Sequence, residues 1–310
     1  MKKIFIDGSA GTTGLRIIER LKNRKDIEVM TLSDDKRKIP EYRKEALNSC
    51  DIAFLCLPDA AAVEAVSFIE NPNVTVIDAS TAHRTNPDWA YGFPELGEEF
   101  ELKIKNSNRI ANPGCYASGF ISLVEPLVKN GIIDGNAQIT CHAVSGYSGA
   151  GKKGIAQYED MELDPLLTGP REYALTQNHK HIPEMKIISG LKNEPIFCPY
   201  VCNFYSGMTV TVPLFASQIK SGFSVKDIKE VYRSLYNGKI VKYFDSIDED
   251  GFISASAIDD KDNMEITVAG NDERILLLSR FNNLGKGASG AAVECMNIKL
   301  GVEKETGLDL

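Results

Sequence analysis

The N-terminus places a strand, a glycine-rich turn and a helix one after another, and this order restricts the fold more than any other stretch. Residues 3–7 form a short apolar run that predicts a buried strand. The turn at residues 8–14 reads GSAGTTG, and apolar residues then recur at helical spacing to Leu21. The spacing is G-x-x-G-x-x-G rather than G-x-G-x-x-G, but glycines still let a pyrophosphate approach the helix N-terminus. The sequence therefore predicts an α/β domain that begins with a dinucleotide-binding turn.

Strands and helices continue to alternate through the first third of the chain. Further strands are predicted at residues 27–32, 51–57 and 74–78, with a helix at residues 59–69. This alternation is typical of an open parallel sheet, in which ligands bind at the carboxyl ends of the strands. Ser80 and Arg84 follow one such end and are candidate site residues, although a turn serine and a surface arginine explain them equally well.

The residues after the second strand bear on the choice of nucleotide. Residues 33–38 read SDDKRK. In this fold an acidic side chain here holds the ribose hydroxyls of NAD, whereas a nearby arginine or lysine accepts the 2′-phosphate of NADP. Ser33, Lys36 and Arg37 favour NADP, while Asp34 keeps NAD open.

One cysteine lies at the start of a predicted helix. Residues 112–116 read NPGCY, and the amphipathic helix extends over residues 116–129. A thiol in this position lies among unpaired backbone N–H groups at the positive end of the helix dipole, which favours the thiolate. Cys115 is therefore a candidate nucleophile, with a buried and unreactive cysteine as the alternative.

A loop rich in small residues follows a strand predicted at residues 138–144. It reads SGYSGAGKK over residues 145–153 and can form an anion-binding nest of backbone N–H groups. It is not a P-loop, because Lys153 stands where that motif needs a hydroxyl. A flexible loop without a ligand is the alternative.

Two of the four histidines lie together in a polar loop at residues 173–184. Because histidine titrates near neutrality, His179 and His181 are candidates for general acid/base chemistry. A His-x-His pair can also bind a metal, but no third ligand has a suitable spacing, so we expect no metal.

The second half of the chain is rich in strands. These are predicted at residues 208–214, 252–258, 264–269 and 275–281, with one helix at 224–236. The pattern predicts an α+β domain with a mainly antiparallel sheet. A last helix, at residues 291–300, is expected to return to the first domain. We therefore expect a first domain of residues 1–114 completed by 284–310, and a second domain of residues 115–283.

Composition restricts the setting and the partners. The apolar N-terminal stretch is too short for a signal peptide, and no apolar run is long enough to span a membrane. Seven scattered cysteines indicate reduced thiols and a cytoplasmic protein. The net charge of −8 argues against nucleic-acid binding, so an anionic substrate has to meet a local positive cluster.

These features together suit one kind of chemistry. A nucleotide turn, a helix-start cysteine, an anion nest and a histidine loop are the parts needed to reduce an acyl group through a covalent thioester. The cysteine attacks the carbonyl and expels a leaving group, such as phosphate, before hydride arrives.

Seven segments carry a resemblance to a known family. In order they are GSAGTTGLRI, AFLCLPDAAA, DASTAHRT, NPGCYASG, VSGYSGAGKK, NHKHIPE and NLGKGASGAAVECMN. Nearly end to end, the chain resembles the N-acetyl-gamma-glutamyl-phosphate reductases of arginine biosynthesis, in their shorter second form. Aspartate-semialdehyde dehydrogenases share the overall plan but not the segments NHKHIPE and GKGASGAAV.

The resemblance implies a fold, a reaction and an assembly. It implies a Rossmann-like NADP-binding domain beside a catalytic and dimerisation domain. The reaction is NADPH-dependent reduction of the acyl phosphate N-acetyl-gamma-glutamyl phosphate to N-acetylglutamate 5-semialdehyde and phosphate, through a cysteine thioester. The alternatives are an aspartate-semialdehyde dehydrogenase and a catalytically silent NADP-binding regulator. A homo-oligomer, dimer or tetramer, is also expected from the strand-rich second domain.

The resemblance also implies roles for single residues. Cys115 is the nucleophile, His179 the favoured acid/base, and His181 a group beside the substrate. The cofactor-binding residues are Gly8, Gly11, Thr12, Thr13, Gly14, Ser33, Arg37, Asn283 and Lys286. The substrate-binding residues are Ser80, Arg84, Asn112, Ser145, Ser148, Gly149 and Lys152. The longer form of the family has SADFR where residues 80–84 read STAHR, so the role of His83 stays open.

Overall fold

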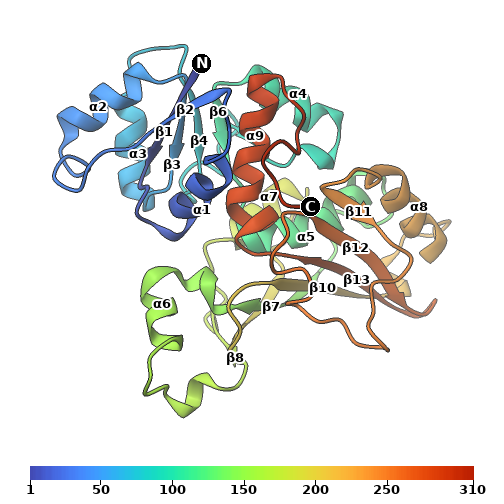
Figure 1. Cartoon of the computed structure of the whole chain (residues 1–310). Coiled ribbons are helices and arrows are strands. Elements are labelled where there is room, and N and C mark those ends of the chain that lie inside the picture. Colours follow the sequence, from blue (N-terminus) through green and yellow to red (C-terminus); the bar gives the residue numbers. More distant parts are fainter. The chain divides into compact units, whose positions relative to one another are not determined.

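The computed structural model describes all 310 residues, which divide into two compact units. Unit 1 comprises Met1–Gly114 and Ala288–Leu308, and unit 2 comprises Cys115–Gly287 and Asp309–Leu310. In Figure 1, unit 1 combines the blue strands of the N-terminus with the red helix near the C-terminus. No helix combines the length and the apolar character that crossing a bilayer requires.

Unit 1 is built on a six-stranded sheet in the order β2-β1-β3-β4-β6-β5. Every pairing in it is parallel, which confirms the predicted parallel α/β architecture. The strands are β1 (Lys2–Asp7), β2 (Ile27–Met30), β3 (Ile52–Leu55), β4 (Thr75–Asp78), β5 (Ala90–Tyr91) and β6 (Arg109–Ala111).

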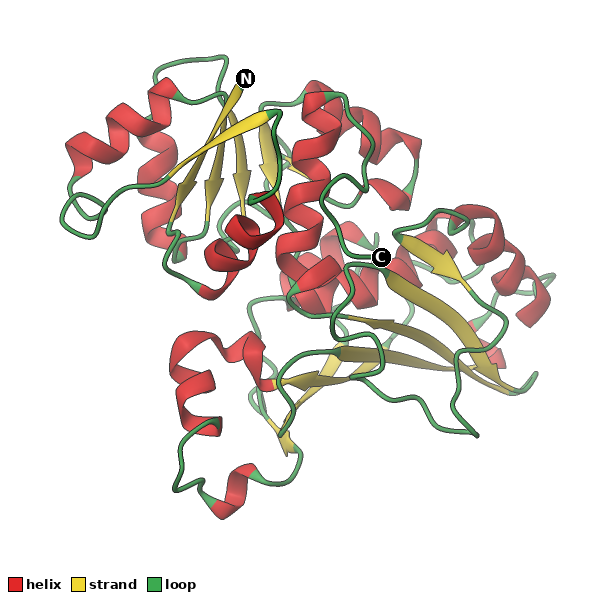
Figure 2. Cartoon of the chain, in the orientation of Figure 1, coloured by secondary structure: helices red, strands yellow, loops and turns green.

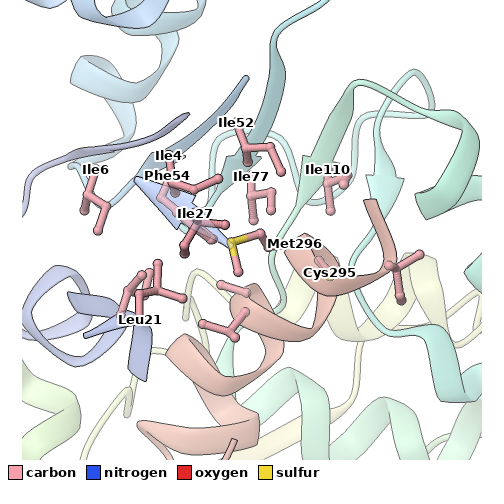
Figure 3. Packing of buried hydrophobic residues seen from close by; sticks show 14 of the residues in the cluster. Ile4, Ile6, Leu21, Ile27, Ile52, Phe54, Ile77, Ile110, Cys295 and Met296 are labelled. Carbon is pink, nitrogen blue, oxygen red and sulfur yellow. The ribbon is translucent and has the colours of Figure 1, made fainter. Parts of the chain in front are cut away.

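Helices cover both faces of this sheet because successive strand residues point to opposite sides. Ile4 and Ile6 face one apolar cluster, whereas Phe5 between them belongs to the other. The first cluster includes residues of α1 (Thr12–Leu21), α4 (Glu98–Asn106) and α9 (Gly290–Leu300). The second includes α2 (Pro40–Ser49) and α3 (Asp59–Ser67). Figure 3 shows Cys295 and Met296 of α9 among the strand residues, so the C-terminal segment supplies part of the unit 1 core.

Unit 2 is built on a seven-stranded mixed sheet in the order β11-β12-β13-β10-β7-β9-β8. The pairs β7–β9 and β11–β12 are parallel, and the other four are antiparallel. The strands are β7 (Thr140–Gly146), β8 (Arg171–Glu172), β9 (Ile196–Cys202), β10 (Met208–Phe215), β11 (Val241–Tyr243), β12 (Met264–Gly270) and β13 (Arg274–Phe281). The sequence patterns did not reveal β9, which carries a proline in its middle.

The helices of unit 2 gather mainly on one side of its sheet (Figure 2). They are α5 (Cys115–Lys129), α6 (Gly151–Tyr158), α7 (Ile182–Ile188) and α8 (Val225–Leu235). Helix α5 packs on β10 and β13, and Gly119 permits this closeness. A Cβ there would lie 2.5 Å from Cγ2 of Val210 and 2.9 Å from the Phe281 ring. The shorter helical turns are η1 (Pro94–Leu96), η2 (Tyr147–Ala150), η3 (Pro165–Leu167), η4 (Ala216–Gln218) and η5 (Gly285–Ser289).

The prediction of a strand at residues 252–258 is wrong. Phe252 forms only an isolated bridge with Glu249, and the residues after it follow local turns. The Ala257 N–H donates to the Ser254 carbonyl, and the Lys261 N–H donates to the Ile258 carbonyl. The alternation of serine with apolar residues resembles a strand, but serine also favours turns.

Candidate active site

The glycine turn of unit 1 leaves its backbone open to a ligand. Gly8 has a φ of +86°, and a Cβ there would lie 2.3 Å from the Cys56 carbonyl oxygen. A Cβ on Gly14 would lie 2.5 Å from the Gly8 carbonyl oxygen. Only glycine fits both positions, so the start of α1 lies directly against the turn.

The N-terminus of α1 suits an anionic group. Gly11 is the N-cap and has no side chain to cap the first N–H groups, and Thr12 and Thr13 are the first helical residues. The first turn contains no acidic residue. Uncapped N–H groups at the positive end of a helix attract phosphate, so these residues fit the pyrophosphate of a dinucleotide.

A buried ion pair, which the sequence patterns did not reveal, lies immediately before the turn. Asp7 ends β1, and Nε of Arg43 donates to its Oδ2 at 3.0 Å. Burial raises the pKa of Asp7, and the Arg43 guanidinium opposes this rise. The same guanidinium donates to Glu64 at 2.7 Å. Arg43 therefore ties α2 and α3 to the strand that carries the turn.

Ser33 and Arg37 lie in one turn after β2. The N–H groups of Lys36 and Arg37 donate to the Ser33 carbonyl at 3.0 and 2.9 Å. Nε of Arg37 lies 2.7 Å from Oδ1 of Asp34, and the Arg37 side chain remains 38% exposed. A ligand phosphate at Arg37 thus has to compete with the Asp34 carboxylate.

The ends of β4 and β6 carry a buried polar network. Oγ of Ser80 donates to Oδ2 of Asp78 at 2.7 Å, and the Asn112 N–H donates to the Asp78 carbonyl at 2.8 Å. Nε of Arg84 donates to the Asn112 carbonyl at 2.9 Å. The structure therefore brings Ser80, Arg84 and Asn112 together in unit 1. Of these, Asn112 precedes Cys115 by three residues in the sequence.

His83 belongs to the same network. Its Nδ1 lies 2.7 Å from Oδ2 of Asp78, and its ring stacks on Trp89 at 4.0 Å between centroids. Both rings are at most 9% exposed. His83 thus supports the carboxylate that holds Ser80, and Trp89 packs against the His83 ring.

Cys115 is the first residue of α5 and is half-buried. The first turn of α5 contains no acidic residue, and none of the seven cysteines forms a disulfide. A Cβ on Gly287 would lie 2.9 Å from Cβ of Cys115, so a glycine is needed beside the thiol. The geometry places the sulfur at the positive end of a 15-residue helix.

Both histidines lie around the residue that follows Cys115. The rings of His179 and His181 are each 6.0 Å from the Tyr116 ring, and they are 4.8 Å from one another. The backbone N–H of His181 donates to Nδ1 of His179 at 3.2 Å. Burial, helped by the charge of Lys180, lowers the pKa of His179 to about 4. His179 is therefore neutral at neutral pH and carries its proton on Nε2.

Two tyrosines that the sequence analysis missed complete this part of unit 2. The Tyr116 and Tyr173 rings lie 6.3 Å apart, and burial raises the pKa of Tyr116. Burial also raises the pKa of Tyr173. The position of Tyr116 directly after the candidate nucleophile was the one available signal for this pair.

The loop at residues 145–153 does not form the expected nest in its first part. The N–H groups of Gly146, Tyr147 and Ser148 donate to the carbonyls of residues 207, 204 and 205. These N–H groups already donate hydrogen bonds within the protein, so they are not available to bind an anion. Gly149 lies in η2, and Lys152 is exposed on α6.

Asn283 and Lys286 are buried inside the protein. Oδ1 of Asn283 accepts the Gly207 N–H at 2.9 Å, and its Nδ2 donates to Oγ of Ser148 at 3.0 Å. Lys286 is 1% exposed in η5. Asn283 thus fixes Ser148, while the cofactor contact of both residues stays a prediction. No group of three or more His, Cys, Asp or Glu side chains has a metal-binding arrangement.

Two family models match the chain. The dimerisation domain of semialdehyde dehydrogenases matches residues 115–283, and the NAD binding domain of the same family matches residues 3–103. An N-acetyl-gamma-glutamyl-phosphate reductase 2 of Nostoc is 44% identical over 99% of both chains. The chain belongs to the N-acetyl-gamma-glutamyl-phosphate reductase family.

Further members of the reductase family match over similar lengths. The reductase of Sinorhizobium medicae is 42% identical over 96% of this chain and 98% of its own. The reductase of Brucella ovis is 43% identical over 96% of this chain and 99% of its own. These lengths agree with the shorter form that the sequence motifs indicated.

Solved structures of more distant proteins share the fold. Aspartate semialdehyde dehydrogenase II of Vibrio cholerae has a TM-score of 0.73 at 16% identity, covering 97% of this chain and 98% of its own. The enzyme of Candida albicans, solved with NADP, has a TM-score of 0.66 at 16% identity, covering 97% of this chain and all of its own. The reductase family thus shares its architecture with the aspartate enzymes.

Proposed function

We propose that this chain catalyses the NADPH-dependent reduction of N-acetyl-gamma-glutamyl phosphate to N-acetylglutamate 5-semialdehyde and phosphate. The observation that carries the proposal is the thiol of Cys115 at the start of α5, with two histidines around the neighbouring Tyr116. The names of the relatives, at 42–44% identity, supply the substrate.

The cofactor site proposed is the glycine turn of unit 1. Gly8, Gly11 and Gly14 support a pyrophosphate site, and we assign Ser33 and Arg37 to the 2′-phosphate. NADPH, when bound, supplies the hydride that reduces the thioester.

Cys115 carries the acyl group through the reaction. Its thiolate attacks the acyl carbon, the carbon–oxygen bond to phosphate breaks, and phosphate leaves. The acyl group is then held as a thioester. After reduction, the carbon–sulfur bond breaks, the aldehyde leaves, and the thiolate is restored. A proton donor neutralises the oxyanion that reduction creates and takes the proton back as that bond breaks.

We assign this proton transfer to His181 rather than to His179, which the sequence analysis favoured. With a pKa near 4 and Nδ1 already accepting a hydrogen bond, His179 can only donate its Nε2–H at neutral pH. A group that gives and takes a proton works best when its pKa lies near the working pH. His179 then acts as a hydrogen-bond donor beside the substrate.

The remaining substrate contacts are proposed on the residues of the two polar clusters. In unit 1 these are Ser80, Arg84 and Asn112, and in unit 2 they are Ser145, Ser148, Gly149 and Lys152. Because the first N–H groups of the 145–153 loop are used internally, the exposed side chains of Lys152 and Lys153 are the groups of this loop that remain to meet an anion.

A homodimer through the open face of the unit 2 sheet is proposed as the assembly. Along β10, Met208, Val210 and Val212 are buried, whereas Thr209 and Thr211 between them are half-exposed on the other face. The family model that matches unit 2 describes a dimerisation domain. The cytoplasmic location and the absence of a nucleic-acid partner stay predictions.

The test is the reverse reaction of the purified protein. N-acetylglutamate 5-semialdehyde should be oxidised only when NADP and inorganic phosphate are both present, because phosphate must release the acyl group from Cys115. Aspartate semialdehyde is the comparison substrate, and faster turnover with it would favour the aspartate enzyme. Turnover without phosphate would contradict the acyl-phosphate mechanism. Binding of NADP without any turnover would identify a silent regulator.

A further inference from the structure

Beside the histidine loop, the side chain of Gln177 makes the hydrogen bonds that a neighbouring strand would otherwise make. Strand β8 pairs with β9 as far as Glu172, and the Tyr173 N–H then donates to the Pro199 carbonyl at 3.1 Å. Beyond that point, Nε2 of Gln177 donates to the Phe197 carbonyl at 2.8 Å. Oε1 of Gln177 accepts the Phe197 N–H at 2.9 Å. The amide of Gln177 thus satisfies both backbone groups of Phe197, as a paired strand residue would.

The backbone that presents Gln177 is unusual. Ala174 has a φ of 57° and Gln177 a φ of 55°, and the Gln177 N–H donates to the Ala174 carbonyl at 2.8 Å. Residues with a Cβ rarely adopt this left-handed conformation. Such conformations persist where the surroundings enforce them, and they concentrate at functional sites. Here the two hydrogen bonds to Phe197 hold the Gln177 side chain that this backbone presents.

Phe197 in turn supports both sides of the proposed active site. Its ring is fully buried and lies 5.2 Å from the Tyr116 ring and 5.2 Å from the His179 ring, edge-on to each. Tyr116 follows the nucleophile, and His179 follows Gln177 by two residues. A shift of Phe197 or of the loop would therefore move the histidines relative to Cys115.

We propose that Gln177 is a positioning residue, whose amide clamp on Phe197 sets the histidine loop at the distance from Cys115 that proton transfer requires. This proposal rests on the proposed function for its effect on turnover, but not for its effect on the loop itself. Gln177 is otherwise exposed, so the two hydrogen bonds to Phe197 are what its side chain contributes.

The experiment compares variants that remove the clamp with neighbours that leave it intact. Gln177→Met keeps the length of the side chain without its polar atoms, and Gln177→Ala removes both. Thr176→Ala, at an exposed neighbour, and Ala174→Gly, which removes the left-handed strain, are the controls. We expect both Gln177 variants to lower kcat of the phosphate-dependent reverse reaction by roughly 10- to 100-fold. The KM for NADP should stay within about twofold, because the glycine turn is untouched.

A second measurement reports the loop without requiring turnover. In histidine-labelled protein, nitrogen NMR should show His179 of the wild type as neutral, with a bare Nδ1, down to about pH 5. In Gln177→Met the loop is released, and His179 should titrate closer to the usual value of about 6.5. If wild type lacks phosphate-dependent turnover while this NMR shift occurs, the proposed function fails and the clamp stands.

Unchanged kcat together with an unchanged His179 titration in either folded Gln177 variant would overturn the proposal. Equal losses in Thr176→Ala would also overturn it, since the effect would then belong to the loop in general. If Gln177→Ala does not fold, Gln177→Met decides, because it preserves the volume and the chain length of the side chain.

Discussion

Cys115 owes its proposed reactivity to its immediate neighbours. It begins α5, so the positive end of the helix dipole lies beside the sulfur. Gly287 provides the space next to its Cβ, and Tyr116 carries the ring around which both histidines gather. A buried cysteine such as Cys141 has none of these features, and burial raises its pKa instead.

Replacing the nucleophile should separate binding from chemistry. We expect Cys115→Ser to lower kcat of the phosphate-dependent reaction by at least roughly a thousandfold, because a serine hydroxyl is a far weaker nucleophile than a thiolate. NADP binding, measured by fluorescence titration, should stay unchanged. Cys141→Ser is the matched control and should retain turnover. An active Cys115→Ser enzyme would exclude the covalent route.

The two histidines should have different effects on the pH profile. We expect His181→Asn to remove any limb that the kcat profile has near neutral pH, because the proposed proton-transfer group is lost. His179→Asn should lower kcat but keep that limb, because a group with a pKa of about 4 does not titrate there. If His179→Asn removes the limb and His181→Asn keeps it, the assignment is reversed.

His179 should also make stability depend on pH. Its pKa is about 4 in the folded chain and about 6.5 when unfolded, so the unfolded state binds the proton more readily. The stabilisation of the neutral ring is fully present above about pH 6.5 and is lost as the pH falls toward about 4. We expect His179→Asn to flatten this part of the urea-midpoint curve. An identical slope in variant and wild type would contradict the low pKa.

At the scale of elements, two close contacts depend on glycine. The first is the contact between α5 and the sheet, where Gly119 packs against Val210 and Phe281. We expect Gly119→Ala to reduce the free energy of unfolding by about 1–3 kcal/mol, because the extra methyl overpacks a buried contact. Gly169→Ala is the control, since nothing lies within 4 Å of its added Cβ. Urea denaturation measures both, and equal stability would show that α5 can shift without cost.

The second close contact is the nucleotide turn. Gly8→Ala places a Cβ 2.3 Å from the Cys56 carbonyl oxygen in a left-handed backbone position, so the turn must move. We expect the Kd for NADP to rise at least roughly tenfold, a loss of about 1.4 kcal/mol. Gly238→Ala, with an ordinary contact of 3.8 Å, should leave the Kd unchanged. Isothermal titration calorimetry measures the Kd for NADP in both variants. An unchanged Kd in Gly8→Ala would show that the nucleotide site lies elsewhere.

At the scale of the whole molecule, the open sheet face of unit 2 determines the proposed assembly. Thr211 lies at the middle of this face, opposite Leu278 of β13 and His142 of β7. We expect the 34.1 kDa chain to sediment as a dimer or a larger even assembly, and Thr211→Arg to shift it toward monomer. Thr31→Arg, on an exposed residue of unit 1, is the control. A wild type that stays monomeric at micromolar concentration would contradict the proposed interface.

Much of unit 1 and many of its candidate residues could be predicted from the sequence alone. The period of the apolar residues and the glycine turn depend on neighbours along the chain, so the sequence determined the parallel α/β architecture, the turn before α1 and the start of α5 at Cys115. The local pattern failed at residues 252–258, where serines alternate like a strand but form turns, and at β9, where a proline interrupts the pattern.

Only the tertiary structure decided how the polar groups are used. The N–H groups of residues 146–148 donate hydrogen bonds to a loop some 60 residues away in the sequence. The expected anion-binding nest is therefore not available there. Burial and the nearby charge of Lys180 make His179 neutral, and the amide of Gln177 holds a strand that the sequence did not reveal. Hydrogen bonds and burial depend on which distant segments meet, and that information is absent from local spacing. The sequence by itself determined the elements and placed the candidate nucleophile at the start of α5, and packing decided how the nearby polar groups are used.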